Sequence, residues 1–487
     1  MSNPPSISGA KFSTDASETI ERKVDIDKSE LSNLDGQSEQ DFDAQFEVSR
    51  TADWINKGRF GKVCLQLPDE LLLHSARLVA ALKRLLNERS CDLFVSADAT
   101  YGSCCIDVIT SRHVRACACV HYGDACLSAP PLDLAVFYVL PKLTFDLTAL
   151  RAKLDHSNVS SSCPVLVLYD IGYAHCADQI LACVRDYFGS EYRVHHATPV
   201  DLTAHATGSE SSSDVTVGRT IVPSLDTSTP YTCLFIGRRQ SPVLPLWSLS
   251  RPSCTQIVSY SVSDQDLVID TCPSTNRSLR RRLYMIEQLR DAQRIAIVCG
   301  TLAVKGHLQI LRRLQILCAR AGKRHYVLSI GKLNVPKLAN FADQVDAFIV
   351  ISCPYGVLLD TRDHVRPVVS VFEAEMAFNA HKQHAWMGQT GWIGEWQKLL
   401  LDDLPTLAAS GVNLGQEETD MSLISGRIRA SAHTGDTTTD GALLPYEPGN
   451  YLSERSWQGL EDTVTRELPV ERAVLGRSGL ASKYEGE

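Results

Sequence analysis

Short apolar runs recur along this chain, and a polar loop and a segment of helical periodicity follow each of them. Three similar series begin this way, at residues 63–67, 164–170 and 294–300. Alternation of this kind predicts parallel sheets covered by helices, because parallel strands need a crossover connection. We therefore predict an α/β protein of three similar domains, each a small parallel sheet flanked by helices, that arose by internal triplication.

The further strands of each series can be placed from the same pattern. They are expected at residues 92–96, 116–121 and 134–140, then at 192–197, 232–237 and 256–260, then at 326–330, 347–352 and 368–371. The longest amphipathic segments predict helices at residues 71–87, 174–188, 276–293 and 306–321. Pro68 and the two acidic residues after it are typical of a helix start.

These elements divide the chain into five parts. They are a disordered leader at 1–45, domain 1 at 46–145, domain 2 at 146–293 with a polar insertion at 203–228, domain 3 at 294–385, and a C-terminal extension at 386–487. Within the extension we expect Trp386, Trp392 and Trp396 to pack against domain 3. Residues 455–461 are typical of a docking peptide.

Charge and hydropathy narrow the class of protein. The chain has 487 residues and a net charge of −9, which argues against a general nucleic-acid binder. No apolar stretch approaches the about 18 residues of a membrane span, and the N-terminus lacks the apolar core of a secretory signal. We therefore expect a cytoplasmic protein that acts neither in a membrane nor directly on nucleic acid.

The chain contains sixteen cysteines, and most of them can be explained as structural residues. In a cytoplasmic chain they do not indicate a disulfide framework. Several lie in apolar strand or helix patterns and are expected to be small buried hydrophobic residues: Cys64, Cys163, Cys183, Cys299 and Cys318.

Three cysteine neighbourhoods differ, because each follows an apolar run predicted to be a buried strand. They contain Cys104 and Cys105, then Cys126, and then Cys353. In parallel sheets, ligands gather at the carboxyl ends of the strands, so these thiolates can converge despite their separation in sequence. Three cysteine ligands without a fourth suggest a cubane iron–sulfur cluster with one open iron.

Two alternatives to a cluster stay open on the residues alone. A structural zinc site usually needs four ligands in closely spaced pairs, and Cys117 and Cys119 lie within a strand with side chains on opposite faces. Three buried cysteines near loops without any metal are the other alternative. His121 and Tyr122 could line the site, although a satisfied strand-end histidine is commoner.

The helix at 276–293 carries three consecutive arginines, Arg280, Arg281 and Arg282. We interpret them as a solvated helix face, with a docking patch for a phosphate or an acidic partner as the alternative.

Residues 97–107 and 120–128 resemble the diphthamide synthase family. Residues 350–354 and 366–369 are similar to that family's third domain, and residues 455–461 and 476–479 resemble its second subunit. The resemblance implies the first step of diphthamide synthesis on elongation factor 2. In that family, S-adenosylmethionine binds at the open iron of a [4Fe–4S] cluster. The 3-amino-3-carboxypropyl radical formed from it adds to a histidine ring.

The resemblance also implies which subunit this is. The family's catalytic subunit takes one ligand cysteine from each domain, but no cysteine lies between Cys183 and Cys233 here. The second subunit takes two from domain 1 and one from domain 3, which implies Cys105, Cys126 and Cys353 as ligands, with Cys104 a possible substitute for Cys105. The implied role is an accessory subunit that keeps the cluster of a related catalytic subunit reduced. The implied partners are that subunit in a heterodimer, elongation factor 2 as substrate, and a small iron-binding electron donor protein.

Overall fold

The computed structural model consists of two compact parts, residues 1–432 and residues 433–487. It describes residues 38–86, 91–96, 101–131, 133–157, 163–189, 194–200, 215–270, 273–357, 363–379, 391–401, 420–424, 426, 428–429, 479–480 and 483–484. In the second part, residues 433–487, the described residues form one antiparallel pair, β17 (Gly479–Leu480) and β18 (Lys483–Tyr484). Among the helices of the described ranges, none combines the length and the apolar character needed to cross a membrane.

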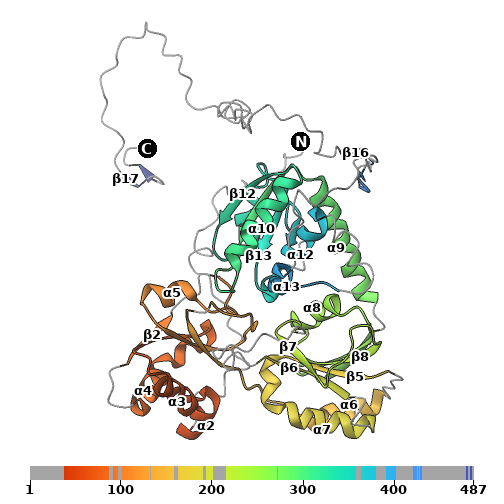
Figure 1. Ribbon diagram of the computed structural model, residues 1–487. Coiled ribbons are helices and arrows are strands. Elements are labelled where there is room, and N and C mark those ends of the chain that lie inside the picture. The colour runs from red at the N-terminus through yellow and green to blue at the C-terminus, as the bar shows by residue number, and fades with distance from the viewer. Residues whose placement is uncertain are drawn as a thin grey trace, which may run out of the picture. The chain divides into compact units, whose positions relative to one another are not determined.

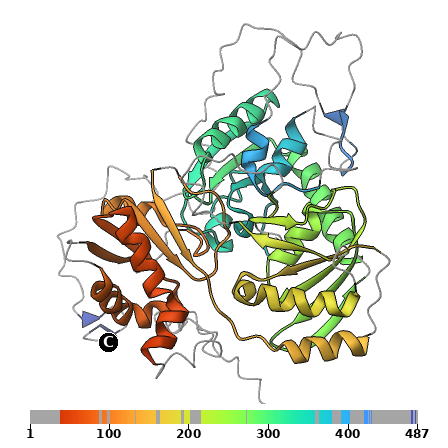
Figure 2. The ribbon, with the colours of Figure 1, turned by 60° about the horizontal axis from the view of Figure 1, so that its bottom comes forward.

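The first sheet contains four parallel strands in the order β2-β1-β3-β4 (Figure 1). They are β1 (Lys62–Gln66), β2 (Asp92–Ser96), β3 (Ala118–Tyr122) and β4 (Ala135–Val139). The helices of this part are α2 (Glu39–Phe46), α3 (Val48–Gly58), α4 (Ser75–Leu85) and α5 (Val108–His113), with the 3-10 turn η1 (Asp69–His74) before α4. Figure 2 shows the red N-terminal helices lying across the orange sheet. Their apolar side chains share one core with Val63, Leu65 and Val120 of the sheet.

The sheet of the third series has the same order, β12-β11-β13-β14, and is also parallel. Its strands are β11 (Arg294–Cys299), β12 (Arg324–Ser329), β13 (Ala347–Ile351) and β14 (Val368–Ser370). The accompanying helices are α10 (His307–Arg320), α11 (Val335–Ala339) and α12 (Val371–Phe378), and α9 (Pro273–Asp291) packs against α12.

The middle sheet repeats this topology and adds a strand at each edge. Its parallel strands follow the order β6-β5-β8-β9. They are β5 (Val165–Tyr169), β6 (Val194–Pro199), β8 (Tyr231–Gly237) and β9 (Cys254–Ser261). The antiparallel edge strands are β7 (Arg219–Val222) and β10 (Asp266–Asp270). The helices are α6 (Leu147–Ser157), α7 (Ala177–Phe188) and α8 (Val243–Ser250), and the 3-10 turn η2 (Ile171–Cys176) precedes α7. In chain order, each sheet therefore places its strands 2-1-3-4, which confirms three similar α/β units.

Two expected irregular segments contain ordered elements. Helix α2 lies inside the leader predicted as disordered, and its Phe42 and Phe46 stack at 4.4 Å between ring centroids and are only 2% exposed. The polar insertion predicted at 203–228 contains β7, whose Arg219 is buried. The parts of these predictions at residues 1–37 and 203–214 lie outside the described residues.

The tryptophans of the extension pack as expected where the structure describes them. Trp392 and Trp396 are buried in one core with Phe372 of α12, and Trp396 begins α13 (Trp396–Leu400). A short antiparallel pair, β15 (Asp420–Met421) and β16 (Ile428–Arg429), follows. Trp386 and the docking peptide predicted at 455–461 lie outside the described residues.

The interpretation of the three arginines as a solvated face is wrong for one of them. Arg280 is exposed, but Arg282 is only 2% exposed and forms an ion pair of 2.5 Å with the fully buried Glu373 of α12. Because α9 crosses over α12, one of three consecutive helical positions must face inward. Arg282 therefore stabilises the packing of two helices.

Candidate metal centre

The cysteines singled out from the sequence lie in loops at the carboxyl ends of strands. Cys104 and Cys105 lie in the loop after β2, and Cys126 lies in the loop after β3. Cys353 follows β13 and caps the 3-10 turn η5 (Pro354–Gly356). This is the edge where parallel sheets bind ligands.

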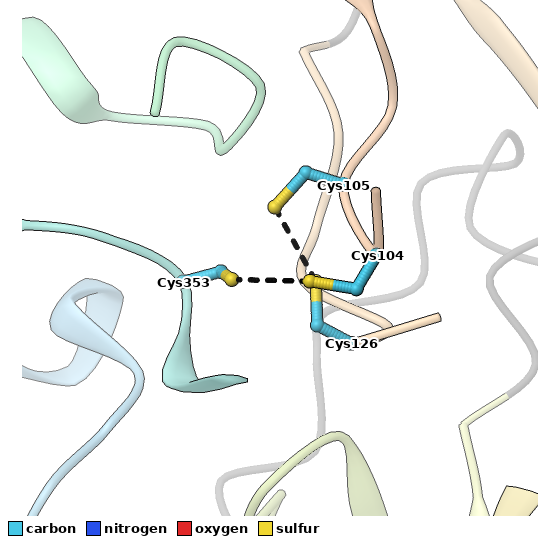
Figure 3. A group of neighbouring side chains, drawn as sticks. All are labelled: Cys104, Cys105, Cys126 and Cys353. Carbon is cyan, nitrogen blue, oxygen red and sulfur yellow. Dashed lines mark hydrogen bonds between the residues drawn. The ribbon is translucent and has the colours of Figure 1, made fainter. Parts of the chain in front are cut away.

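All four thiols meet at one point. Their sulfur atoms lie within 4.8 Å of one another. Figure 3 shows Cys104 Sγ facing Cys353 Sγ, at 3.7 Å, and Cys105 Sγ facing Cys126 Sγ, also at 3.7 Å. Cys105, Cys126 and Cys353 are buried, and Cys104 is half-buried. The structure thus brings together the three predicted residues and adds Cys104, expected only as a substitute, to the same group.

Backbone contacts hold the loops in this arrangement. The Cys126 N–H donates to the Cys104 carbonyl at 3.1 Å, which joins the first two loops. Gly218 of the middle unit packs so closely that a Cβ there would lie 2.7 Å from the Cys126 carbonyl oxygen. Its φ of +67° also favours glycine. The middle unit therefore supports the site without contributing a thiol from its described cysteines.

The close thiols shift one another's pKa in opposite directions. Hydrogen bonds from the Cys104, Cys105 and Cys353 thiols hold the pKa of Cys126 well below its usual range. Hydrogen bonds with Cys104, Cys126 and Cys353, together with burial, raise the pKa of Cys105 well above it. Several buried thiolates this close together would repel one another, which limits how many can form without a counter-charge. A bound cationic centre would remove that limit.

The neighbouring aromatic residues have structural roles. His121 Nε2 lies 3.0 Å from the Asp124 carbonyl oxygen, and burial lowers the pKa of this histidine. Only one ring nitrogen is satisfied, because Nδ1 is buried without a hydrogen-bond partner among the described residues, and Cys126 lies close enough to influence the pKa of this histidine. Tyr122 belongs to the core on the other side of the first sheet, beside Phe46, so it does not line the site.

The remaining cysteines of the first sheet stay outside the group. Cys117 is exposed, and Cys64 and Cys119 are register partners in the buried centre of the β1–β3 pair. A shallow pocket lies beside Cys105 and is lined by Tyr101, Gly102 and Ala303, among others. Sequence reasoning missed Arg219, Tyr355 and Glu395, which lie around the cysteine loops, because no motif marks them.

Comparison with known proteins decides the family. The model of the diphthamide synthesis protein family matches residues 67–390. The chain belongs to this family. It is 34% identical over 455 residues to the Caenorhabditis elegans 2-(3-amino-3-carboxypropyl)histidine synthase subunit 2, a match covering 92% of this chain and 93% of that protein. It is 32% identical over 507 residues to the Xenopus laevis protein of the same name, covering 99% of each. This member of the diphthamide synthesis family therefore corresponds to subunit 2 of the synthase.

A solved structure shares the fold of this chain. It is the crystal structure of Dph2 from Pyrococcus horikoshii with a 4Fe-4S cluster, which is 16% identical to this chain. The TM-score is 0.50, and the match covers 68% of this chain and 90% of that one. The likeness shows that this chain shares the fold of that protein.

Proposed function

We propose that this chain is the iron–sulfur subunit 2 of the synthase that begins diphthamide formation. That complex transfers the 3-amino-3-carboxypropyl group from S-adenosylmethionine to a histidine of elongation factor 2. The observation that carries the proposal is the meeting of four thiols from two sheets within 4.8 Å. Cys105, Cys126 and Cys353 are the proposed ligands of a [4Fe–4S] cluster, with Cys104 as the possible substitute for Cys105.

The chemistry of the donor set supports this cofactor. Thiolates are the usual protein ligands of iron–sulfur clusters, and such a cluster supplies single electrons when bound. Ser352, next to Cys353, has a buried hydroxyl that lacks a hydrogen-bond partner among the described residues. Such a donor could bond to an inorganic sulfide or to a ligand sulfur. The buried loops would also keep water from the centre.

The finer proposal is that this subunit supplies electrons to a related catalytic subunit. The middle unit supports it, because its described cysteines lie outside the thiol group. The ligand set then differs from the arrangement of one cysteine per domain expected of a catalytic subunit. The proposed partners are that subunit in a cytoplasmic heterodimer, elongation factor 2 as substrate, and a small iron-binding protein that delivers electrons.

The test uses the co-purified heterodimer with Cys353→Ser in this chain. With a limiting biological reductant, the variant should lose most of its transferase activity, whereas excess dithionite should restore it because the partner's centre is reduced directly. Iron per heterodimer should fall at the same time. Full activity with the limiting reductant and unchanged iron would favour a purely structural scaffold instead.

A separate experiment tests whether the chain is itself catalytic. The chain alone, with its iron rebuilt anaerobically and dithionite added, should not cleave S-adenosylmethionine. Release of methylthioadenosine above the level of the Cys126→Ser variant would mean that this subunit performs the transfer itself.

A single zinc ion is the second candidate for the site, and the spacing of the sulfur atoms favours it. Sulfurs about 2.3 Å from a tetrahedral ion lie roughly 3.8 Å apart. The two Sγ–Sγ distances of 3.7 Å are close to that value. A cluster would leave iron and inorganic sulfide in the purified chain, whereas a zinc site would leave zinc and neither of these.

A further inference from the structure

Arg219 is a buried cation at the edge of the middle sheet. Its side chain is among the largest fully buried ones of the described residues, with 1% exposure. The guanidinium donates to three acceptors: the Val217 carbonyl at 2.9 Å, the Tyr169 carbonyl at 3.1 Å, and the Tyr355 hydroxyl at 3.2 Å. Tyr169 ends β5, so these bonds hold the turn before β7 against the carboxyl end of the middle sheet.

The same contacts reach both cysteine loops. Gly218, next to Arg219, packs against the Cys126 carbonyl. Tyr355 is two residues after Cys353 and belongs to the turn that Cys353 caps. The turn at 217–219 therefore contacts the Cys126 loop through Gly218 and the turn after Cys353 through the bond from Arg219 to Tyr355.

The carboxyl group that feels the charge of Arg219 is that of Asp170, whose pKa is raised by burial while Arg219 opposes the rise. Among the described residues no Asp or Glu forms an ion pair with it, and its Nε has no partner. The nearby Asp170 instead bonds to Ser241 and the Arg238 N–H. A buried cation is costly unless negative charge lies near it. Asp170 is such a charge, and the three hydrogen bonds of the guanidinium offset the cost of burial further.

Glu395 supports the same turn from the other side. Its carboxylate accepts the Gly218 N–H at 3.4 Å, and burial raises its pKa. The next residue, Trp396, donates its indole N–H to the Lys305 carbonyl at 3.1 Å. The Lys305 N–H in turn donates to Ala129, three residues after Cys126. The turn at 217–219 is thus held both by the hydrogen bonds of the Arg219 side chain and by the bond from Gly218 to Glu395, so its position next to the Cys126 loop is well defined.

We propose that Arg219 is a positioning residue of the metal centre. Its hydrogen bonds hold the turn at 217–219 between the Cys126 loop, which Gly218 contacts, and the Cys353 loop, which Arg219 reaches through Tyr355. The middle unit then contributes a guanidinium where the other two contribute thiolates. This inference rests on the proposed function, because it concerns the same centre.

The test measures how fast the reconstituted full-length chain loses iron to a ferrous chelator without oxygen. Arg219→Met, which removes all three hydrogen bonds, should release iron about 10–100-fold faster than the unaltered chain, as expected when a residue supporting a metal ligand is lost. Arg219→Lys should fall in between, because an ammonium group can keep only part of the bonding to the three acceptors. Tyr355→Phe removes one hydroxyl and should release iron several-fold faster, with an altered electron paramagnetic resonance spectrum of the reduced centre.

The control separates positioning from general loss of stability. Arg313 is also buried but pairs with Glu375, away from the cysteines, so Arg313→Met should lower the melting temperature and leave iron release unchanged. Iron release and spectra equal to those of the unaltered chain in Arg219→Lys and Tyr355→Phe would overturn the inference, even if Arg219→Met failed to fold. If the unaltered chain retained iron through Cys126, the proposed function would survive that result. If it retained none, both would fail.

Discussion

Adjacent cysteines rarely point to one site, yet Cys104 and Cys105 do so here. The loop after β2 turns so that Cys104 Sγ faces Cys353 and Cys105 Sγ faces Cys126. Four thiols are therefore available for the three ligand positions proposed. Strand-end position in the sequence was enough to select the neighbourhoods, but the turn of one loop decides which thiol points where.

Serine substitutions test the ligands one at a time. Cys126→Ser and Cys353→Ser should each lower the iron bound per chain after anaerobic reconstitution, because a serine hydroxyl replaces a required thiolate. Cys117→Ser is the matched control, since Cys117 is exposed and outside the group. Undiminished iron in either of the first two variants would remove that residue from the ligand set.

The adjacent pair should behave unequally. If three thiolates hold the centre, Cys105→Ser should lose iron and Cys104→Ser should keep most of it. Iron and sulfide analysis of both variants measures this. The reverse pattern would assign Cys104 as the ligand, and loss in both would indicate four ligands.

Residue patterns could not reveal Arg219. A single arginine in a polar stretch carries no periodic signal, and its burial depends on contacts with Tyr169 and Tyr355, which are distant in sequence. Arg282 was misjudged for a related reason. Its position in a run of arginines suggested solvent, whereas the crossing of α9 and α12 places it opposite Glu373.

At the scale of elements, α12 carries unusual buried charge. Glu373 pairs with Arg282 of α9, and Glu375 pairs with Arg313 of α10. Glu373 also forms a capping box with Ser370 at the start of the helix. Two neighbouring helices are thereby attached to α12 through ion pairs that water cannot replace.

Breaking one of these pairs should be costly. Glu373→Gln leaves Arg282 buried without a counter-charge and should lower the free energy of unfolding by about 3–5 kcal/mol. The control is Asp133→Asn at the exposed pair with Arg112, which should change it by less than about 1 kcal/mol. Chemical denaturation measures both, and equal effects would contradict the role given to the buried pair.

Helix α2 was missed because it is short and mostly polar, so only its two aromatic residues signal burial. Deleting residues 1–37 should leave stability unchanged, because α2 remains. Deleting residues 1–46 removes Phe42 and Phe46 from the core and should cost about 3 kcal/mol or more. Thermal unfolding of the two truncated chains compares them, and indistinguishable melting temperatures would show that α2 is dispensable.

At the scale of the whole molecule, the repeated pattern of apolar runs was sufficient to predict three α/β units. The shared strand order 2-1-3-4 explains why Cys105, Cys126 and Cys353 lie at equivalent sheet edges. The meeting of those edges was not predictable from local pattern. It depends on contacts between units, such as those of Gly218 with Cys126 and of Lys305 with Ala129.

The most direct measurement is Mössbauer spectroscopy with iron, sulfide and zinc analysis of the chain after anaerobic reconstitution. Our account predicts about four iron and four sulfide ions per chain in a cubane cluster, lost together when Cys126 or Cys353 is replaced by serine. A chain that instead retains one zinc ion and neither iron nor sulfide would contradict it.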